Sequence, residues 1–318
     1  MLIVKPIQLA VVFISFVFAY FLATLPIDVF YDRGNYLVYA QNSINILLRY
    51  LNRGVLNVFS NEPLWLSINI ILSSWLSPEN TLRIIIFFAS FISTSLVLKN
   101  NQKYWYLVFL ILLLPQVIKN DIVHLRQGLA LAIFLIGWYS RNRRTKLLFI
   151  GLAPFIHTSF FFIDFILLVT FILKYLRYSK GIRAIVIVLL GIVLNFSLIF
   201  ITSLLGARQA DQYSQVDMSV SGLAFIFWFV ILIVFLSEGK QFANKYAFEQ
   251  AAVIFYLTTY FFMPVTARIF ESAILLVLLA GLQLTKWRRW VFLAGFTFYF
   301  IYSYLPRLSQ PLLGWAVH

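Results

Sequence analysis

Long apolar runs recur along nearly the whole chain, and they restrict what it can fold into. The runs hold about 17 to 22 residues, which is the length a helix needs to cross a bilayer. Of the 318 residues, 62% are hydrophobic and only 11% are charged. A soluble domain carries about a quarter charged residues and has too little interior to hide this much apolar surface. We therefore expect lipid to surround most of the chain.

The predicted fold is an all-α, polytopic transmembrane helical bundle with about 11 spans and one re-entrant or interfacial helix. No linker rich in Pro, Gly or Ser divides the sequence and no repeat is evident, so residues 1–318 are expected to form a single transmembrane domain. The first run is longer than a signal-peptide core and lacks a small-residue cleavage site. The predicted spans lie near 7–26, 81–98, 104–118, 122–140, 145–157, 158–174, 184–205, 220–237, 247–264, 268–285 and 290–305.

The connections between these runs are of two kinds. One kind is rich in Lys and Arg, and the positive-inside rule places it in the cytoplasm. The other kind carries acids and single arginines, and its two large members are the predicted outer loops near 28–62 and 206–219. The basic clusters are Lys99 with Lys103; Arg141, Arg143 and Arg144 with Lys146; Lys174, Arg177 and Lys180 with Arg183; Lys240 with Lys245; and Lys286 and Arg288 with Arg289.

The segment at 63–76 decides whether this topology is consistent. If it crossed the membrane, every later basic cluster would lie outside the cell. Its roughly 15 residues give about 22 Å of helix, whereas the hydrocarbon core is about 30 Å thick. We therefore expect this segment to enter the membrane and return, or to lie at the interface. A short tilted span is the alternative.

Composition and motifs exclude several classes of function. The net charge of +14 follows the cytoplasmic clusters, so no nucleic-acid partner is expected. The absence of cysteine rules out a disulfide or a thiolate nucleophile. No GxGxxG, Walker A, HExxH or GxSxG motif occurs. A nucleotide-sugar substrate is therefore not indicated.

Several polar residues instead gather at the outer ends of the predicted helices. Arg126 is the most informative, because a charge about one turn inside an apolar run is costly unless it faces the protein interior. The outer basic residues are nearly all Arg, and the guanidinium group suits bidentate binding of phosphate. The candidates are Asp32, Glu62, Arg126, His157, Arg208, Arg268 and Glu271.

Each candidate also has a structural interpretation. Arg126 could extend to the interface or pair with Asp121, and His157 could be a structural hydrogen-bonding residue. Asp32 could cap the helix that follows it.

Similar alternatives apply later in the chain. Arg268 and Glu271 are three residues apart on one helical face and could form a simple ion pair. Asp164 lies in the middle of a predicted span, where an acid is a functional candidate but can also serve as a hydrogen-bond acceptor.

The order of these residues resembles a known family, the EpsG-like branch of the Wzy-type polysaccharide (O-antigen) polymerases. The resemblance covers about residues 28 to 285. It rests on Asp32 with Tyr36, the Glu62–Pro63 pair before an amphipathic helix, the RQGLA tract at Arg126–Ala130, His157 at the end of a span, Arg208 near Tyr213, and Arg268 at a late helix start.

The resemblance implies a glycosyltransferase on the periplasmic face of the bacterial inner membrane. Donor and acceptor would both be glycans linked to undecaprenyl pyrophosphate, and a chain-length regulator protein is a further candidate partner. The resemblance implies no soluble cofactor and no metal. Arg126, Arg208 and Arg268 would stabilise the charge of the leaving pyrophosphate, and Glu62, Asp32 or His157 would take the proton of the acceptor hydroxyl. The remaining candidates for binding the glycan or pyrophosphate are Gln127, Tyr36, Tyr213 and Glu271.

Three other classes of membrane protein were considered. A ligase that transfers finished glycan would use the same donor and the same arginine chemistry. A transporter or lipid-glycan flippase would instead predict inverted repeats and ion sites at mid-membrane. In a non-catalytic scaffold, the outer arginines would be dispensable for function.

Overall fold

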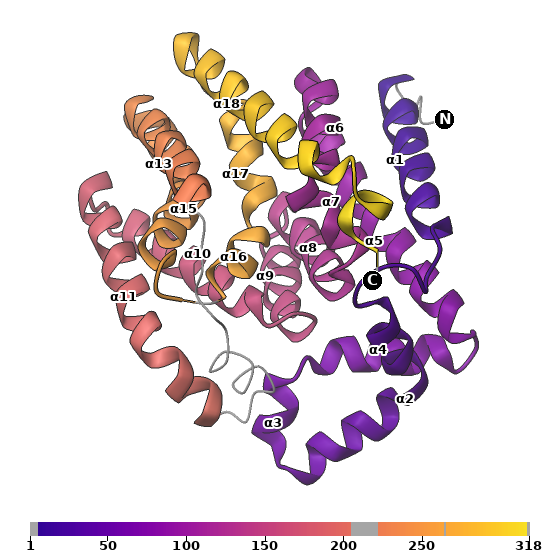
Figure 1. Cartoon of the computed structure of the whole chain (residues 1–318). Coiled ribbons are helices and arrows are strands. Elements are labelled where there is room, and N and C mark those ends of the chain that lie inside the picture. Colours follow the sequence, from indigo (N-terminus) through magenta and orange to yellow (C-terminus); the bar gives the residue numbers. More distant parts are fainter. Residues whose placement is uncertain (1–5, 205–221, 264, 317–318) are drawn as a thin grey trace. The chain divides into compact units, whose positions relative to one another are not determined.

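The structure, a computed structural model, describes residues 6–204, 222–263 and 265–316, and all regular elements within them are helical (Figure 1). The all-α prediction is thereby confirmed for the described residues. The contacts group the chain into two units, one formed by residues up to Thr158 together with those from Tyr302, the other by Ser159–Ile301. This grouping of contacts does not test the predicted single transmembrane domain, which remains a prediction.

Unit 1 holds the first half of the helices and the C-terminal turns. Its core is the packing of α5 against α1 and α8, with α9 on α8 and α4 on α2. Its elements are α1 (Pro6–Thr24), α2 (Arg33–Asn52), α3 (Val55–Ser60), α4 (Pro63–Ser73), α5 (Pro78–Asn100), η1 (Gln102–Tyr104), α6 (Trp105–Leu113), α7 (Pro115–Ile122), α8 (Leu125–Tyr139), α9 (Arg143–Leu152), η2 (Ala153–Phe155), the end of α18, η3 (Leu305–Arg307) and η4 (Pro311–Gly314).

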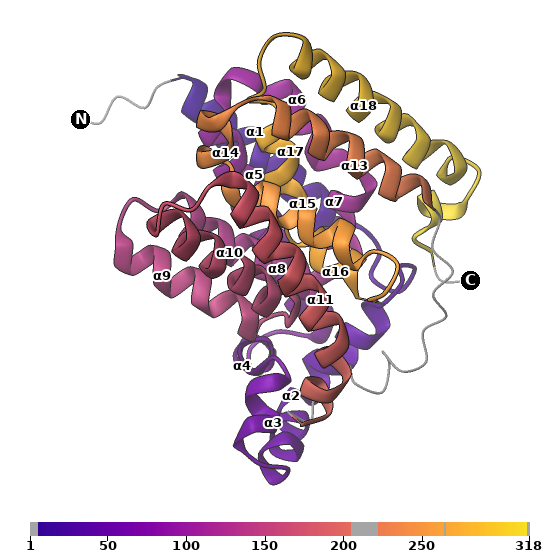
Figure 2. The same cartoon turned by 90° about the vertical axis from the view of Figure 1, so that its left-hand side faces the viewer.

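Unit 2 is centred on α15, which is buried along most of its length and packs against α10, α11 and α13. Figure 2 shows α10, α11 and α15 running beside one another. The elements of this unit are α10 (Ser159–Tyr175), α11 (Lys180–Leu204), α13 (Gly222–Ser237), α14 (Lys240–Lys245), α15 (Ala247–Thr259), α16 (Thr266–Glu271), α17 (Ile274–Gly281) and α18 (Lys286–Tyr304).

Three described helices are long and apolar enough to cross a membrane by themselves, namely Ile7–Thr24, Pro78–Asn100 and Lys180–Ser197. The chain is therefore a membrane protein. A fourth crossing is possible if α6 and α7 form one broken span. Several other predicted spans are shorter helices or pairs of helices, so the count of eleven spans remains a prediction.

The predicted span at 104–118 was wrong as a continuous helix. The chain bends by 68° between η1–α6 and α7. Pro115 is the first residue of α7, and Leu114 before it has an extended backbone, as a residue preceding proline prefers. The carbonyl of Leu113 accepts a hydrogen bond from the Tyr304 hydroxyl, and Gln116 Nε2 donates to Ser303 Oγ at 3.2 Å. The Tyr304 hydroxyl at the end of α18 thus satisfies a backbone carbonyl at the break.

The segment that was predicted to dip is α4, a helix of 11 residues that begins at Pro63. A helix of that length is about 17 Å long, which is too short to cross a core of about 30 Å. The outer segment before it, 28–62, folds mainly into α2 and α3. Trp65 and Leu66 of α4 are fully buried, so the helix is anchored within unit 1.

Two arginines bind backbone carbonyls near the ends of helices in unit 1: Arg33 of the outer segment and Arg83 of α5. Arg33 is fully buried, and it donates from Nε to the carbonyl of Ile122 and from Nη1 to that of Pro26, both at 2.8 Å. Arg83 donates from Nη1 to the carbonyls of Ala23 and Leu25. Burial and the nearby Arg83 charge lower the pKa of Arg33 to about 10, which still leaves it charged at neutral pH. The expectation that outer arginines serve phosphate binding does not fit these two residues.

Gly137 allows α8 and α9 to approach closely. A Cβ at this position would lie 2.9 Å from the backbone nitrogen of Ile150 and 2.9 Å from the carbonyl oxygen of Lys146. We predict that Gly137→Ala lowers the free energy of unfolding by about 1–3 kcal/mol, because the two backbones must separate. Thermal unfolding in one detergent measures this effect. Gly151→Ala is the matched control, because a Cβ there meets nothing within 4 Å. Equal melting temperatures for the two variants would contradict this close packing.

Candidate functional site

Glu62 lies at the start of α4 in an uncommon backbone conformation. Its φ of 59° and ψ of 56° are left-handed, and its side chain does not cap the helix. A non-glycine residue in this region costs on the order of 1–3 kcal/mol and persists where its surroundings enforce it. Pro63 needs no backbone partner at the first helical position, so the Glu62 carboxylate is free to turn inward. The side chain is only 4% exposed.

Arg126 provides the counter-charge for this buried carboxylate. Its Nη1 donates to Glu62 Oε2, and the guanidinium is 17% exposed. Arg126 lies in the first turn of α8, which starts at Leu125 after a break at Val123 and His124. The Arg126 Nε is buried without a hydrogen-bond partner among the described residues. The cluster thus includes one donor that the described residues leave unpaired.

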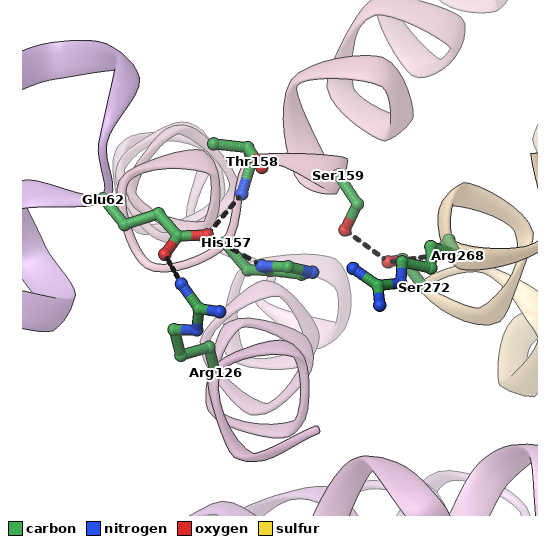
Figure 3. A network of polar contacts seen from close by, with 7 residues as sticks. All are labelled: Glu62, Arg126, His157, Thr158, Ser159, Arg268 and Ser272. Atoms are coloured by element: carbon green, nitrogen blue, oxygen red, sulfur yellow. Dashed lines mark hydrogen bonds and ion pairs between the residues drawn. The ribbon is translucent and has the colours of Figure 1, made fainter. Parts of the chain in front are cut away.

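His157 binds the other oxygen of the same carboxylate (Figure 3). Its Nδ1 lies 2.9 Å from Glu62 Oε1, and the backbone N–H of Thr158 reaches that oxygen at 3.4 Å. Both residues lie in the turn between η2 and α10. When Nδ1 is the protonated nitrogen and donates to Glu62, Nε2 is left as a hydrogen-bond acceptor. We call Glu62, Arg126, His157 and Thr158 the Glu62 cluster.

Aromatic rings from α2 form one wall of the Glu62 cluster. The Arg126 guanidinium lies 5.7 Å from the ring centre of Tyr36 and 5.5 Å from that of Tyr39. Trp65 packs edge-on against both tyrosines. Burial raises the pKa of Tyr36, and the Arg126 charge partly opposes that rise, so its phenol remains neutral at physiological pH. These rings hold the cation in place and exclude water from it.

The structure brings four of the predicted site residues together, namely Glu62, Arg126, His157 and Tyr36. Gln127 is buried next to Arg126 in α8. Asp32 is exposed, and its Oδ1 accepts from Asn35 Nδ2 at 3.3 Å. Asp32 precedes α2 but its side chain does not cap that helix, so the capping alternative was wrong. The proposed pairing of Arg126 with Asp121 was also wrong, because Arg126 pairs with Glu62.

The later candidates belong to unit 2 or lie outside the described residues. Arg268 is exposed on α16, and Glu271 is half-buried at the end of the same helix. Beside them, Ser272 Oγ lies 2.8 Å from Ser159 Oγ (Figure 3). Arg208 and Tyr213, with the whole of the predicted outer loop at 206–219, fall outside the described residues.

Sequence reasoning did not identify Tyr39 and Thr158. Tyr39 follows Tyr36 by three residues, so the two share one face of α2, and this spacing was visible in the sequence. Thr158 contributes a backbone N–H, which any residue type supplies. No sequence pattern could have found it.

Fold and site together define a helical membrane protein with a buried, charged cluster beside a short helix that cannot span the bilayer. The chain belongs to the EpsG family, whose model matches residues 9–305. That is a family of Wzy-like polymerases, so the chain's activity is in general terms that of polysaccharide polymerisation. No curated protein and no solved structure matched the chain.

The charge balance of the Glu62 cluster can be tested by removing its charges singly and together. Removing one partner of a buried ion pair typically lowers stability by about 3–5 kcal/mol, because the other charge stays buried without compensation. We predict that Glu62→Gln and Arg126→Met each lower the melting temperature strongly, and that the double variant melts above both. Glu79→Gln is the control, because Glu79 is exposed in the first turn of α5. Additive losses in the double variant would show that the two side chains are not coupled.

Proposed function

We propose that this protein polymerises a surface polysaccharide from lipid-linked repeat units. In this reaction a growing glycan moves from undecaprenyl pyrophosphate onto the terminal sugar of a second undecaprenyl-pyrophosphate-linked unit, and O-antigen or a related polymer is the product. The observation that carries the proposal is the buried carboxylate of Glu62, which holds an arginine and a histidine at the same place. The arginine suits the pyrophosphate of the donor, and the histidine suits the hydroxyl of the acceptor. These are the two reacting groups.

Arg126 is the residue we assign to the leaving group. When the bond between the sugar C1 and the pyrophosphate oxygen breaks, negative charge grows on that oxygen. A preorganised guanidinium in a dry site stabilises this charge without reorganising. Glu62 holds Nη1 of Arg126 through a hydrogen bond, and the aromatic wall holds the plane of the guanidinium. The Nε of Arg126 remains a donor without a partner among the described residues. The arginine is therefore already positioned before substrate arrives.

His157 is the residue we assign to the acceptor hydroxyl. As the hydroxyl oxygen bonds to C1, its proton passes to His157 Nε2, and Glu62 stabilises the imidazolium that forms. This is the relation of acid to histidine in the hydrolase triads. The geometry favours His157 over the two carboxylates as the base. Both Glu62 oxygens are engaged, and Asp32 is exposed and accepts a hydrogen bond from Asn35.

An apolar groove in unit 1 offers a place for the isoprenoid chain. It encloses about 610 Å³, its open mouth included, and is lined by Ile68, Ile71, Leu72, Ile84, Ile85, Phe88 and Leu129. Leu129 follows Arg126 by about one turn on α8, and Ile68 lies on the helix that Glu62 begins. A lipid whose pyrophosphate contacts Arg126 could extend its chain along these residues.

The proposed location is the periplasmic face of the bacterial inner membrane. The basic clusters that follow α5, α8 and α10 would lie in the cytoplasm by the positive-inside rule. The start of α8, which carries Arg126, then faces the other side. Polymerisation at that face would use repeat units that have already crossed the membrane.

We predict that Arg126→Ala, expressed in a strain lacking its own gene, abolishes the ladder of repeat lengths in extracted surface glycan. Losing one charge-stabilising donor typically slows a reaction by about 10²–10³-fold. Glycan with a single repeat unit should remain, because flipping and ligation do not use this residue. Arg53→Ala is the control, since Arg53 is an exposed arginine in the same outer segment.

Two outcomes would contradict this proposal. A normal ladder from Arg126→Ala, at membrane levels equal to wild type, would make Arg126 a structural residue. Loss of all surface glycan would instead point to a ligase or a flippase.

A further inference from the structure

A second polar cleft lies within unit 2, apart from every residue of the Glu62 cluster. Its interior volume is about 20 Å³, and the space between its walls reaches about 340 Å³ when the open solvent at its mouth is counted. Four small alanines in its walls leave the space that larger side chains would fill. The lining residues are Thr170, Lys180, Arg183, Ala184, Ile187, Leu236, Ala243, Ala247, Gln250, Ala251 and Ile254.

Two buried polar groups in this cleft have no partner. Thr170 is 4% exposed and Gln250 is 6% exposed. The Thr170 hydroxyl and the Gln250 Nε2 make no hydrogen bond to the described part of the chain. A buried polar group without a partner typically costs about 1–3 kcal/mol. Two such groups lining one cleft indicate that something else satisfies them.

Two cations complete the lining. Arg183 is 8% exposed, and its Nη2 donates to Asn244 Oδ1 at 2.9 Å and to the carbonyl of Ala243 at 3.4 Å. Lys180 Nζ donates to the carbonyl of Leu236 at 3.3 Å. All four polar residues of the cleft can donate a hydrogen bond, and no acid is among its lining residues. Glu249 precedes Gln250 on α15 but does not line the cleft.

We infer that this cleft binds the phosphate of an anionic phospholipid headgroup. The donors match the oxygens of a phosphate, and the two cations match its charge. Ala184, Ile187, Leu236 and Ile254 give the cleft an apolar wall, which suits the glycerol and acyl part of a lipid better than a soluble ion. Lys180 and Arg183 belong to a basic cluster assigned to the cytoplasmic side, where anionic lipids attract such residues.

The test measures lipid binding by the purified full-length chain in detergent. Phosphatidylglycerol, phosphatidylcholine and inorganic phosphate are titrated separately, and the dissociation constant and the melting temperature are recorded. The variants are Lys180→Gln, Arg183→Gln and Gln250→Leu. Arg144→Gln is the control, because Arg144 is an exposed arginine of another basic cluster. If Arg183→Gln fails to fold, Lys180→Gln still tests the lipid site, because the hydrogen bond that Lys180 donates is exposed.

We expect wild type and Arg144→Gln to bind phosphatidylglycerol more tightly than phosphatidylcholine. Each cleft variant should raise the phosphatidylglycerol dissociation constant by about tenfold, the effect of one charge-assisted hydrogen bond. Equal binding of inorganic phosphate would overturn the lipid assignment in favour of a soluble anion. Cleft variants that bind like wild type would overturn the site, and a buried water would then satisfy Thr170 and Gln250.

Discussion

A carboxylate buried among apolar helices must be compensated, and the arrangement of unit 1 around Glu62 follows from that requirement. Glu62 reaches Arg126 on α8 and the His157–Thr158 turn before α10, and it starts α4. Three segments distant in sequence are thus joined at one carboxylate. Removing either charge would leave the other buried without compensation. This costs more stability than replacing both residues with apolar ones. The strained backbone of Glu62 is maintained by these same bonds.

The short and broken helices of the chain serve this same centre. Because α4 is too short to cross the bilayer, its N-terminus can place Glu62 beside Arg126 within unit 1. The break between α7 and α8 starts a new helix at Leu125, so Arg126 lies in a first turn and not in the middle of a continuous span. Irregular backbone within a membrane protein is tolerated where protein groups satisfy it. The Tyr304 hydroxyl does so for the carbonyl of Leu113 before Pro115.

The sequence was sufficient to predict the helical membrane class and the short helix at Pro63, and it singled out Arg126, Glu62 and His157, which the structure brings into contact. The length of an apolar run and the presence of a charge within it are local features of the sequence. They therefore indicate spans and candidate site residues without a structure. The pairing of Glu62 with Arg126 could not be predicted, because 64 residues separate them. Asp121, an acid nearer in sequence, was considered only as an alternative partner, and that alternative was wrong.

The roles of the other outer arginines were also hidden in the sequence. Arg33 and Arg83 bind backbone carbonyls that become available only where α1 and α7 end in the folded chain. Composition cannot distinguish such an arginine from one that binds phosphate. The span at 104–118 was predicted as continuous because apolarity continues through the bend at Pro115, whereas the helix does not.

The central claim is that the Glu62 cluster is built to bind a lipid pyrophosphate. The most direct measurement is the affinity of the purified chain for undecaprenyl pyrophosphate compared with undecaprenyl monophosphate, in wild type and in Arg126→Lys. The lysine keeps the charge but loses the planar fork that matches phosphate oxygens. We expect wild type to prefer the pyrophosphate by about tenfold, as one charge-assisted contact provides, and Arg126→Lys to lose most of that preference. Equal affinity of wild type for the two lipids, or a preference unchanged by the substitution, would contradict the account.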